Sequence, residues 1–297
     1  MSAGLMSSGL LSEIMQVVTE IDSIRAQVGQ WRNAGLRIAL VPTMGALHAG
    51  HLSLVDLARR TNDRVVVSLF VNPLQFGPNE DFDRYPRTFA RDCEQLEAQG
   101  ADALFAPPDA QMYPEGRDGQ TRVHVPRLAE MLCGQSRPGF FDGVATVVTK
   151  LLNAVQPDVA IFGEKDFQQL VVIRRLVRDL NLPVEILAGP TVREPDGLAM
   201  SSRNAYLTTE ERAIAPQLYQ HLQKAAQALG QRAELAEVEA EGLASLNAAG
   251  LRVDYFSVLR AEDLAAPAPG DDKLVILAAA YLGHTRLIDN LRLERSP

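Results

Sequence analysis

The stretch VPTMGALHAGHLSLV, residues 41–55, decides the fold expected for this chain. The apolar run RIALV at 37–41 predicts a short buried strand, and PTMG at 42–45 predicts the loop that leaves its end. The apolar face of a helix follows, formed by Leu52, Leu54, Val55 and Ala58. A strand that leads directly into a helix is the repeating unit of an open parallel sheet, and ligands bind such sheets beyond the carboxyl ends of the strands.

Two histidines lie in this strand-to-helix turn, in the pattern His48-x-Gly50-His51. A glycine lets the backbone approach a ligand closely, and the unpaired N–H groups of a helix N-terminus favour phosphate. Histidines three residues apart lie on the same side of a helix, so both could contact one anion. The alternative is a helix start with two histidines facing solvent. A metal site is disfavoured because no third ligand stands nearby at a useful spacing.

Composition indicates a globular protein of two domains. A length of 297 residues exceeds one ordinary domain, and the contents of 46% apolar and 22% charged residues are ordinary. The net charge of −8 argues against a large nucleic-acid surface, and no apolar run is long enough to span a membrane. Cys93 and Cys133 show no paired spacing, which favours inert thiols in the cytoplasm. Residues 1–16 lack the basic start of a signal peptide and are interpreted as a ragged terminus.

The first 190 residues alternate apolar runs with amphipathic stretches, which predicts an α/β fold with a doubly wound, Rossmann-like parallel sheet. Further strands are expected at 65–71, 103–106, 159–162 and 184–188, and helices at 88–98, 144–155 and 167–180. Residues 107–141 read as turns.

The pattern changes after Gly189 and Pro190. Helices are expected at 209–229 and 233–249, followed by strands at 253–259, 273–281 and 285–291. Helices followed by strands predict a smaller α+β domain over residues 191–297, joined to the first domain at residues 1–190.

Two further motifs could bind phosphate. In FGEKDF, residues 162–167, Gly163 permits a tight turn, Lys165 offers positive charge to phosphate, and Asp166 could accept hydrogen bonds from ribose. The alternative is a solvated helix cap. In DGLAMSSRN, residues 196–204, two hydroxyls and an arginine suit the end of a triphosphate, although an ordinary polar loop is the competing interpretation.

Amides and carboxylates form a weaker set of candidates. Amides can bind hydroxyl and carboxylate groups without adding charge, or can be satisfied structural groups; they are Asn72 and Gln75, near Phe76, and Gln168 and Gln169. Four carboxylates could include one that assists Mg²⁺, although most such groups face water; they are Asp81, Asp83, Asp92 and Glu94. The phosphate-binding G-x-x-x-x-G-K-[ST], dinucleotide-binding G-x-G-x-x-G and hydrolase G-x-S-x-G patterns do not occur at the expected positions.

The HxGH turn and the later MSSR segment together resemble the paired signature of the HIGH/KMSKS nucleotidyltransferase superfamily. Within it, the chain is similar to the pantoate–β-alanine ligase (pantothenate synthetase) family. The similar blocks are VPTMGALHAGHLSLV at 41–55, VSLFVNPLQF at 67–76, YPRT at 85–88, SRPGFFDGVATVVTKLLN at 136–153, FGEKDFQQL at 162–170, REPDGLAMSSRNAYL at 193–207 and TRLIDN at 285–290.

The resemblance implies that ATP and pantoate form pantoyl adenylate and pyrophosphate, and that β-alanine then displaces AMP to give pantothenate. It implies catalytic roles for His48, His51 and Lys165, with His51 matching the family's proton donor. It implies ATP binding by Met44, Gly45, Ala46, Leu47, His48, Ala49, Gly50, His51, Gly163, Glu164, Lys165, Asp166, Val192, Met200, Ser201, Ser202 and Arg203. Gln75 and Gln169 match the glutamines that bind pantoate, Gln75 also lying towards β-alanine. Mg²⁺, held largely by ATP oxygens and water without a direct protein ligand, and a homodimer are likewise implied.

One departure from the family pattern lies between Leu132 and the Arg-Pro-Gly turn. The family's common Glu or Gly is replaced there by Cys133-Gly134-Gln135, whereas Arg137 is retained. Two rival interpretations stay open: another HIGH-type nucleotidyltransferase that uses a phosphorylated substrate, and a regulatory module that binds a nucleotide without turnover.

Overall fold

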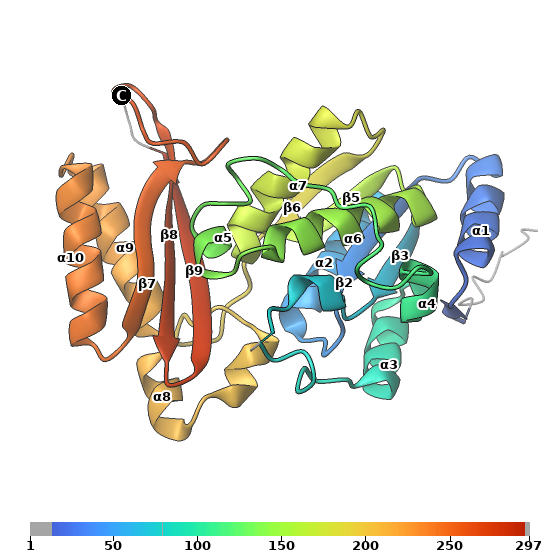
Figure 1. Cartoon of the computed structure of the whole chain (residues 1–297), viewed down its shortest axis with the longest axis horizontal. Coiled ribbons are helices and arrows are strands. Elements are labelled where there is room, and N and C mark those ends of the chain that lie inside the picture. The colour runs from blue at the N-terminus through green and yellow to red at the C-terminus, as the bar shows by residue number, and fades with distance from the viewer. Residues whose placement is uncertain (1–13, 79, 295–297) are drawn as a thin grey trace, which may run out of the picture.

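The computed structural model describes residues 14–78 and 80–294. Its first domain is built on a six-stranded sheet in the order β1-β4-β3-β2-β5-β6 (Figure 1). All of the pairings within this sheet are parallel. The strands are β1 (Gln16–Val18), β2 (Ile38–Thr43), β3 (Arg64–Leu69), β4 (Ala103–Phe105), β5 (Val159–Gly163) and β6 (Glu185–Gly189). The predicted parallel sheet is therefore confirmed.

Helices cover both faces of this sheet. One face packs against α1 (Ile21–Asn33), α6 (Phe140–Val155) and α7 (Phe167–Asp179), and the other against α2 (Ala49–Thr61) and α3 (Phe89–Gln99). The residues at 38–41 of β2 are all apolar because both faces of the strand are buried: Ile38 and Leu40 belong to one core, and Ala39 and Val41 to the other. The fold is thus doubly wound, as the alternating pattern predicts.

The chain reverses its direction across the sheet between β2 and β5. After β2 it proceeds through α2 to β3 on one side, whereas after β5 it proceeds through α7 to β6 on the other. A crevice opens at the carboxyl ends of the strands where the order reverses, and this is where ligands bind. The histidine turn leaves β2 at this point, and the short turn η2 (Glu164–Asp166) leaves β5.

The second domain is a three-stranded antiparallel sheet with helices α9 and α10 packed on one face (Figure 1). Its elements are α8 (Thr209–Ile214), α9 (Gln217–Gly230), α10 (Leu235–Ala248), β7 (Arg252–Arg260), β8 (Lys273–Leu282) and β9 (Thr285–Glu294). This arrangement confirms the predicted smaller α+β domain.

The predicted single helix at 209–229 is wrong, because it is broken at Pro216. Helix α8 begins after Thr208, whose side chain forms a reciprocal capping box with Glu211, and it ends at Ile214. Proline lacks a backbone N–H and clashes with the preceding turn inside a helix. At the N-cap of α9 neither cost arises, so a second helix starts directly after Pro216.

Sequence reasoning missed the first two elements, β1 and α1. Residues 1–13 of the predicted ragged terminus lie outside the described residues, but its end is ordered: Met15 is buried and Gln16 pairs with Ala103 of β4. The predicted turn region at 107–141 also contains α4 (Asp109–Met112) and α5 (Cys133–Ser136), and α6 starts four residues before the prediction. Two short turns, η1 (Pro73–Gln75) and η3 (Ser202–Tyr206), complete the structure.

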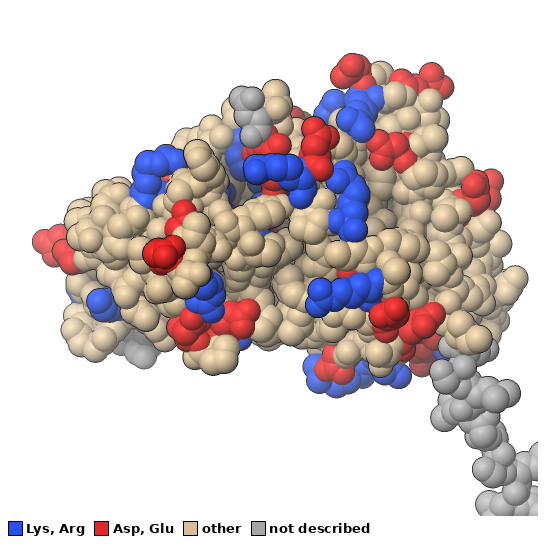
Figure 2. Space-filling view, turned by 90° about the horizontal axis from the view of Figure 1, so that it is seen from below, with Lys and Arg blue, Asp and Glu red and all other residues tan. Residues whose placement is uncertain are grey.

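The surface in Figure 2 carries acidic and basic side chains interspersed, without a broad basic area on the face shown. Cys93 and Cys133 are both free thiols, and Cys133 is buried. None of the helices in the described part of the chain combines the length and the apolar character that crossing a bilayer requires.

Candidate functional site

A cleft of about 880 Å³ lies at the carboxyl ends of β2 and β5, and both domains line it. Among the predicted site residues, it brings together positions up to 159 apart in the sequence, from Met44 to Arg203. The predicted site residues along its wall are Met44, His48, Gly50, His51, Gln75, Gly163, Lys165, Asp166, Gln169, Val192, Met200, Ser201, Ser202 and Arg203. The three motifs that are predicted to bind phosphate therefore face one space.

Five of the predicted ATP-binding residues do not line the cleft: Gly45, Ala46, Leu47, Ala49 and Glu164. The Glu164 side chain points away and accepts a hydrogen bond from Arg292 of β9 at 2.5 Å. Of the other four, Gly45, Ala46 and Leu47 lie in the turn between β2 and α2, and Ala49 is the exposed first residue of α2.

Each histidine of the turn has one ring nitrogen occupied by the backbone. The Nδ1 of His48 accepts the N–H of Gly50 at 3.2 Å, and the Nδ1 of His51 accepts the N–H of His48 at 3.4 Å. Their ring centroids are 4.0 Å apart. Because Nδ1 is an acceptor in both rings, a neutral ring must carry its proton on Nε2. The helix cap thus fixes the tautomer and makes both histidines potential N–H donors to a ligand.

Both imidazoles are neutral near pH 7. Burial and the nearby charge of Lys165 lower the pKa of His48 to about 4. Burial lowers the pKa of His51 to about 3, with smaller contributions from His48 and Lys165. Without a bound anion, this pair therefore offers neutral hydrogen-bond donors, and Lys165 supplies the positive charge beside them.

Asp92 of α3 holds the backbone of the histidine turn. Its Oδ2 accepts the N–H of Ala46 at 3.0 Å and its Oδ1 accepts the N–H of Leu47 at 2.9 Å, while the Thr88 hydroxyl donates to Oδ1. Asp92 is only 1% exposed, so it does not face water, unlike what the sequence predicts for most of the four candidate carboxylates. The turn needs this support because Gly45 and Ala46 both have positive φ angles, of 80° and 51°.

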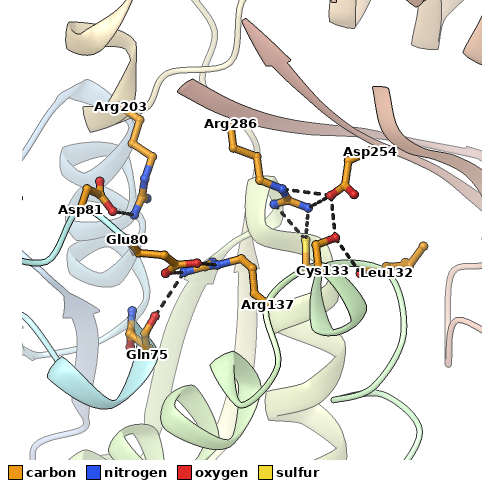
Figure 3. Close-up of polar contacts among 10 residues, drawn as sticks. Gln75, Glu80, Asp81, Leu132, Cys133, Arg137, Arg203, Asp254 and Arg286 are labelled. Atoms are coloured by element: carbon orange, nitrogen blue, oxygen red, sulfur yellow. Dashed lines mark hydrogen bonds and ion pairs between the residues drawn. The ribbon is translucent and has the colours of Figure 1, made fainter. Parts of the chain in front are cut away.

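The MSSR segment reaches across the cleft from the second domain. Ser201 caps η3, where its Oγ accepts the N–H of Arg203 at 3.3 Å. Ser202 Oγ lies 3.4 Å from the Tyr85 hydroxyl, and Arg203 Nη2 donates to Asp81 Oδ1 at 3.1 Å. Figure 3 shows Arg203 pointing towards Asp81 in this way. The MSSR segment therefore meets the opposite wall through polar contacts, whereas deeper between the domains Leu264, Val275 and Leu277 join the apolar core of the first domain.

Gln75 lies at the end of η1, buried to 8% exposure. Its Oε1 accepts a hydrogen bond from Asn72 at 3.1 Å, and its Nε2 approaches Met44 Sδ at 2.8 Å. Arg137 donates to the Gln75 carbonyl at 3.2 Å and pairs with Glu80 through two bonds (Figure 3). The position of this amide is thus set by groups from three separate segments.

The close approach of α6 to η1 depends on Gly143, which sequence reasoning missed. A Cβ at this position would lie 2.2 Å from the Leu74 carbonyl oxygen, which is far too close for any real contact. Asn72 also donates to the Gly143 carbonyl at 3.0 Å. A glycine in a helix is the available sequence signal, but it does not say which backbone comes near.

The adjacent glutamines separate into two roles. Gln168 is buried and fully bonded: it donates to the carbonyls of Leu128 and Met131 and accepts the N–H of Cys133. Gln169 lines the cleft. Of the remaining candidates, Asn72 accepts a 2.6 Å bond from the Tyr113 hydroxyl and is structural. Asp83 and Glu94 are exposed.

In residues 14–78 and 80–294, no three His, Cys, Asp or Glu side chains converge in an arrangement suited to holding a metal ion. The cationic groups on the wall of the cleft include Lys165, Arg137 and Arg203. This charge suits an anionic ligand, and the length of the cleft lets groups from both domains contact it.

Known proteins resemble the chain over almost its whole length. The family model for pantoate-beta-alanine ligase matches residues 16–292. A pantothenate synthetase of Alkalilimnicola ehrlichii is 59% identical over 274 residues, which cover 91% of this chain and 95% of that protein. A pantothenate synthetase of Pseudomonas aeruginosa is 58% identical over 278 residues, which cover 93% and 98%.

Solved structures agree with these sequence matches. Pantothenate synthetase from Thermus thermophilus has a TM-score of 0.87 at 47% identity, covering 93% of this chain and 99% of that one. Pantoate-beta-alanine ligase from Francisella tularensis, complexed with beta-gamma ATP and beta-alanine, has a TM-score of 0.77 at 36% identity, covering 93% and 97%. The chain therefore belongs to the pantoate–β-alanine ligase family.

Proposed function

We propose that this ligase joins pantoate to β-alanine in two steps, with ATP as the activating substrate. In the first step a pantoate carboxylate oxygen attacks the α-phosphorus of ATP, the bond from that phosphorus to the β-bridging oxygen breaks, and pyrophosphate leaves. In the second step the β-alanine nitrogen attacks the acyl carbon of pantoyl adenylate, loses a proton, and AMP leaves. The single observation that supports this most strongly is the convergence of His48, Lys165 and Arg203 on one interdomain cleft.

The main task of the site is to bring two anions together and to stabilise the charge that develops on pyrophosphate. Lys165 offers a fixed positive charge, and the Nε2–H groups of His48 and His51 offer neutral donors beside it. Ser201, Ser202 and Arg203 would contact the β,γ end from the other domain. His51 then acts as a hydrogen-bond donor. With a pKa of about 3, its ring is neutral at pH 7 before ATP binds and does not carry the extra proton that an acid catalyst would donate.

The remaining assignments follow the lining of the cleft. Gly163, Asp166 and Val192 would surround the nucleoside, together with Met44, Gly50 and Met200. The backbone at Gly45, Ala46, Leu47 and Ala49 would shape the turn, and Glu164 would act through its place in η2. Gln75 and Gln169 would bind pantoate, and Gln75 would also contact β-alanine. Neutral amides suit this task, since pantoate carries hydroxyls as well as a carboxylate.

Mg²⁺ enters the proposal as the counter-ion of ATP. Magnesium retains several waters and accepts phosphate oxygens as ligands, so it does not require a cage of protein carboxylates. The described residues, which include no three-ligand cluster, fit a metal held mainly by ATP oxygens and water. When bound, it would neutralise part of the triphosphate charge, and we assign it no protein ligand.

We further infer that the boundary lies near residue 190 and that residues 191–297 close over ATP. The support is that polar contacts, such as Ser202 with Tyr85, join the two walls of the cleft. X-ray scattering should show a more compact particle with adenylate than without it; identical profiles would contradict closure. A homodimer is expected from the family, and sedimentation would measure it.

The decisive assay is AMP release in the presence of ATP, pantoate and β-alanine. Release should require both carbon substrates, and radiolabel exchange between ATP and pyrophosphate should require pantoate alone. A different HIGH-type nucleotidyltransferase would ignore pantoate, and a regulatory nucleotide-binding module would show no turnover. AMP release at the same rate with and without pantoate and β-alanine would contradict the proposed function.

The role of His51 has a test of its own. His51→Ala should reduce pantoate-dependent exchange by roughly 10²-fold, because it removes one donor to a developing charge. Circular dichroism and thermal unfolding would show whether the variant is folded. A folded variant with wild-type exchange would remove His51 from the mechanism.

A further inference from the structure

The phosphate-facing lysine is supported from the opposite domain. Lys165 lies in η2, which belongs to the first domain, but Asn290 of β9 donates its side-chain N–H groups to the carbonyls of Glu164 and Lys165. Both hydrogen bonds measure 2.9 Å. One amide thus holds two consecutive peptide groups at the base of the Lys165 side chain.

Asn290 is itself held in a fixed orientation. It is 6% exposed, and its backbone N–H donates to the carboxylate of Asp289 at 2.7 Å. Asp289 is 4% exposed and accepts two hydrogen bonds from Arg193, at 2.6 and 2.9 Å. The guanidinium of Arg193 lies 3.5 Å from the ring centre of Tyr219. A buried ion pair with its hydrogen bonds satisfied is rigid, because breaking it would leave an uncompensated charge.

A second bond from β9 reaches the same turn. Arg292, two residues beyond Asn290 and on the same side of the strand, pairs with the Glu164 side chain at 2.5 Å. Side chains of β9 therefore bind η2 in two ways: Asn290 bonds to its backbone carbonyls, and Arg292 bonds to the side chain of Glu164. The corresponding bond beside the contact of Arg203 with Asp81 is longer, because the Tyr206 hydroxyl donates to the Arg84 carbonyl at 3.4 Å.

We propose that Asn290 is a positioning residue for Lys165, which it places against the phosphates of ATP by fixing the two peptide groups around it. This inference rests on the proposed function, in which Lys165 contacts phosphate. The misplacement of a binding group by about 1 Å can reduce a rate by roughly 10²-fold. A hydrogen bond that does not contact the ligand can therefore still affect the reaction, because it sets the position of a group that does. Asn290 is not proposed to touch ATP.

The test compares two ligands that differ in their phosphates. Asn290→Ala should weaken ATP binding by roughly tenfold in calorimetry, while the affinity for adenosine, which has no phosphate for Lys165, changes by less than about twofold. A residue that merely stabilises the fold would weaken both ligands alike. Asn247→Ala is the matched control, because Asn247 also bonds to backbone groups of the second domain but lies far from η2. It should leave both affinities unchanged.

Double variants decide whether Asn290 acts through Lys165. In a Lys165→Ala background, Asn290→Ala should cause no further loss of ATP affinity, because the group it positions is absent. Losses that multiply, equal weakening of both ligands, or unchanged ATP binding in Asn290→Ala would each overturn the proposal. If Asn290→Ala does not fold, Asn290→Asp keeps the size of the side chain, replaces the donor, and should give the same ligand-selective loss. Normal ATP binding by Lys165→Ala alone would instead overturn the function proposed for Lys165.

Discussion

Arg203 donates to Asp81 at 3.1 Å, so the arginine that is proposed to bind the triphosphate already has a carboxylate partner. Both side chains are mostly buried, with exposed fractions of 29% for Arg203 and 14% for Asp81. The contact joins the second domain to the loop that also carries Glu80, the partner of Arg137 (Figure 3). An entering triphosphate must therefore compete with Asp81 for the same guanidinium.

Removal of this competitor should tighten ATP binding. In Asp81→Asn the guanidinium of Arg203 keeps a neutral neighbour but loses its charged one, so the dissociation constant for ATP without metal should fall by roughly three- to tenfold. Isothermal calorimetry measures it. Asp83→Asn, which changes an exposed carboxylate of the same loop, is the control and should show no change. Weaker binding in Asp81→Asn would contradict the competition.

The histidine pair makes stability depend on pH in a specific direction. Because the folded pKa values of about 4 and 3 lie below the unfolded value near 6.5, the unfolded chain binds more protons between those limits. The free energy of unfolding should therefore fall as pH drops from 6.5 towards 4, by up to about 1.4 kcal/mol per pH unit for each histidine. Urea unfolding at pH 7 and pH 5 should show a smaller loss in a His48→Asn, His51→Asn double variant.

His124 provides a comparison of opposite sign. Its Nδ1 lies 2.8 Å from Asp142, and this bond raises its pKa, so its contribution to stability is present at low pH and disappears as pH rises through that pKa. His124→Asn should therefore lose stability at pH 5 relative to pH 7 more steeply than the wild type. If all three substitutions alter the pH dependence in the same direction, the assignment to the buried pair is wrong.

Asp92 should affect both stability and ATP binding. Asp92→Asn replaces one acceptor of the buried carboxylate by a donor that faces backbone N–H groups, which should cost about 1–3 kcal/mol in the free energy of unfolding. The KM for ATP should rise as the turn at Gly45 and Ala46 loses its support. Urea unfolding and steady-state kinetics measure the two effects. Glu94→Gln, on the exposed side of the same helix, should change neither quantity.

The neighbouring glutamines should respond differently to the same change. Gln169→Ala should raise the KM for pantoate by roughly tenfold and leave thermal stability unchanged, because its side chain lines the cleft. Gln168→Ala should lower the free energy of unfolding by about 1–3 kcal/mol, since it leaves two buried carbonyls without their donor. Identical effects from the two variants would show that the structure has separated their roles wrongly.

Gly143→Ala should displace Gln75, which is proposed to bind pantoate, although residue 143 is not itself proposed to contact the substrate. The added methyl would meet the Leu74 carbonyl, so η1 must move and carry Gln75 with it. We expect a higher KM for pantoate with a smaller change in the KM for ATP. Gly29→Ala, in α1 where nothing lies within 4 Å of the added atom, is the control and should if anything stabilise the helix, by roughly 0.5–1 kcal/mol. Unchanged pantoate kinetics in Gly143→Ala would contradict this account.

The sequence predicts what depends on local pattern and misses what depends on tertiary neighbours. The run before Val41 predicts β2 because both faces of that strand are buried, and the helix after His48 follows from its apolar spacing. The break at Pro216 is also readable, but a composition rich in Ala, Glu and Gln on both sides favours one long helix. Nothing local distinguishes Asp92, which bonds to a turn 45 residues away, from the exposed Glu94.

The same limit applies within the site. The motifs around His48, Lys165 and Ser201 name three polar turns, and only the reversal of strand order between β2 and β5 brings the first two to one crevice. The contact of Asn290 with η2 spans 125 residues to Lys165 and involves an ordinary strand residue. No periodicity or spacing marks such a position, because its partners are backbone carbonyls, which every residue carries.

The bonds from β9 to η2 also limit how the two domains could be exchanged between related enzymes. A chimaera that took its second domain from another member of the family would bring a foreign strand against Glu164 and Lys165. The position of Lys165 in the chimaera would then depend on which residue the foreign strand carries at position 290. An exchange between enzymes would therefore have to move β9 together with Glu164 and Lys165, to which it bonds, wherever the boundary between the domains is drawn.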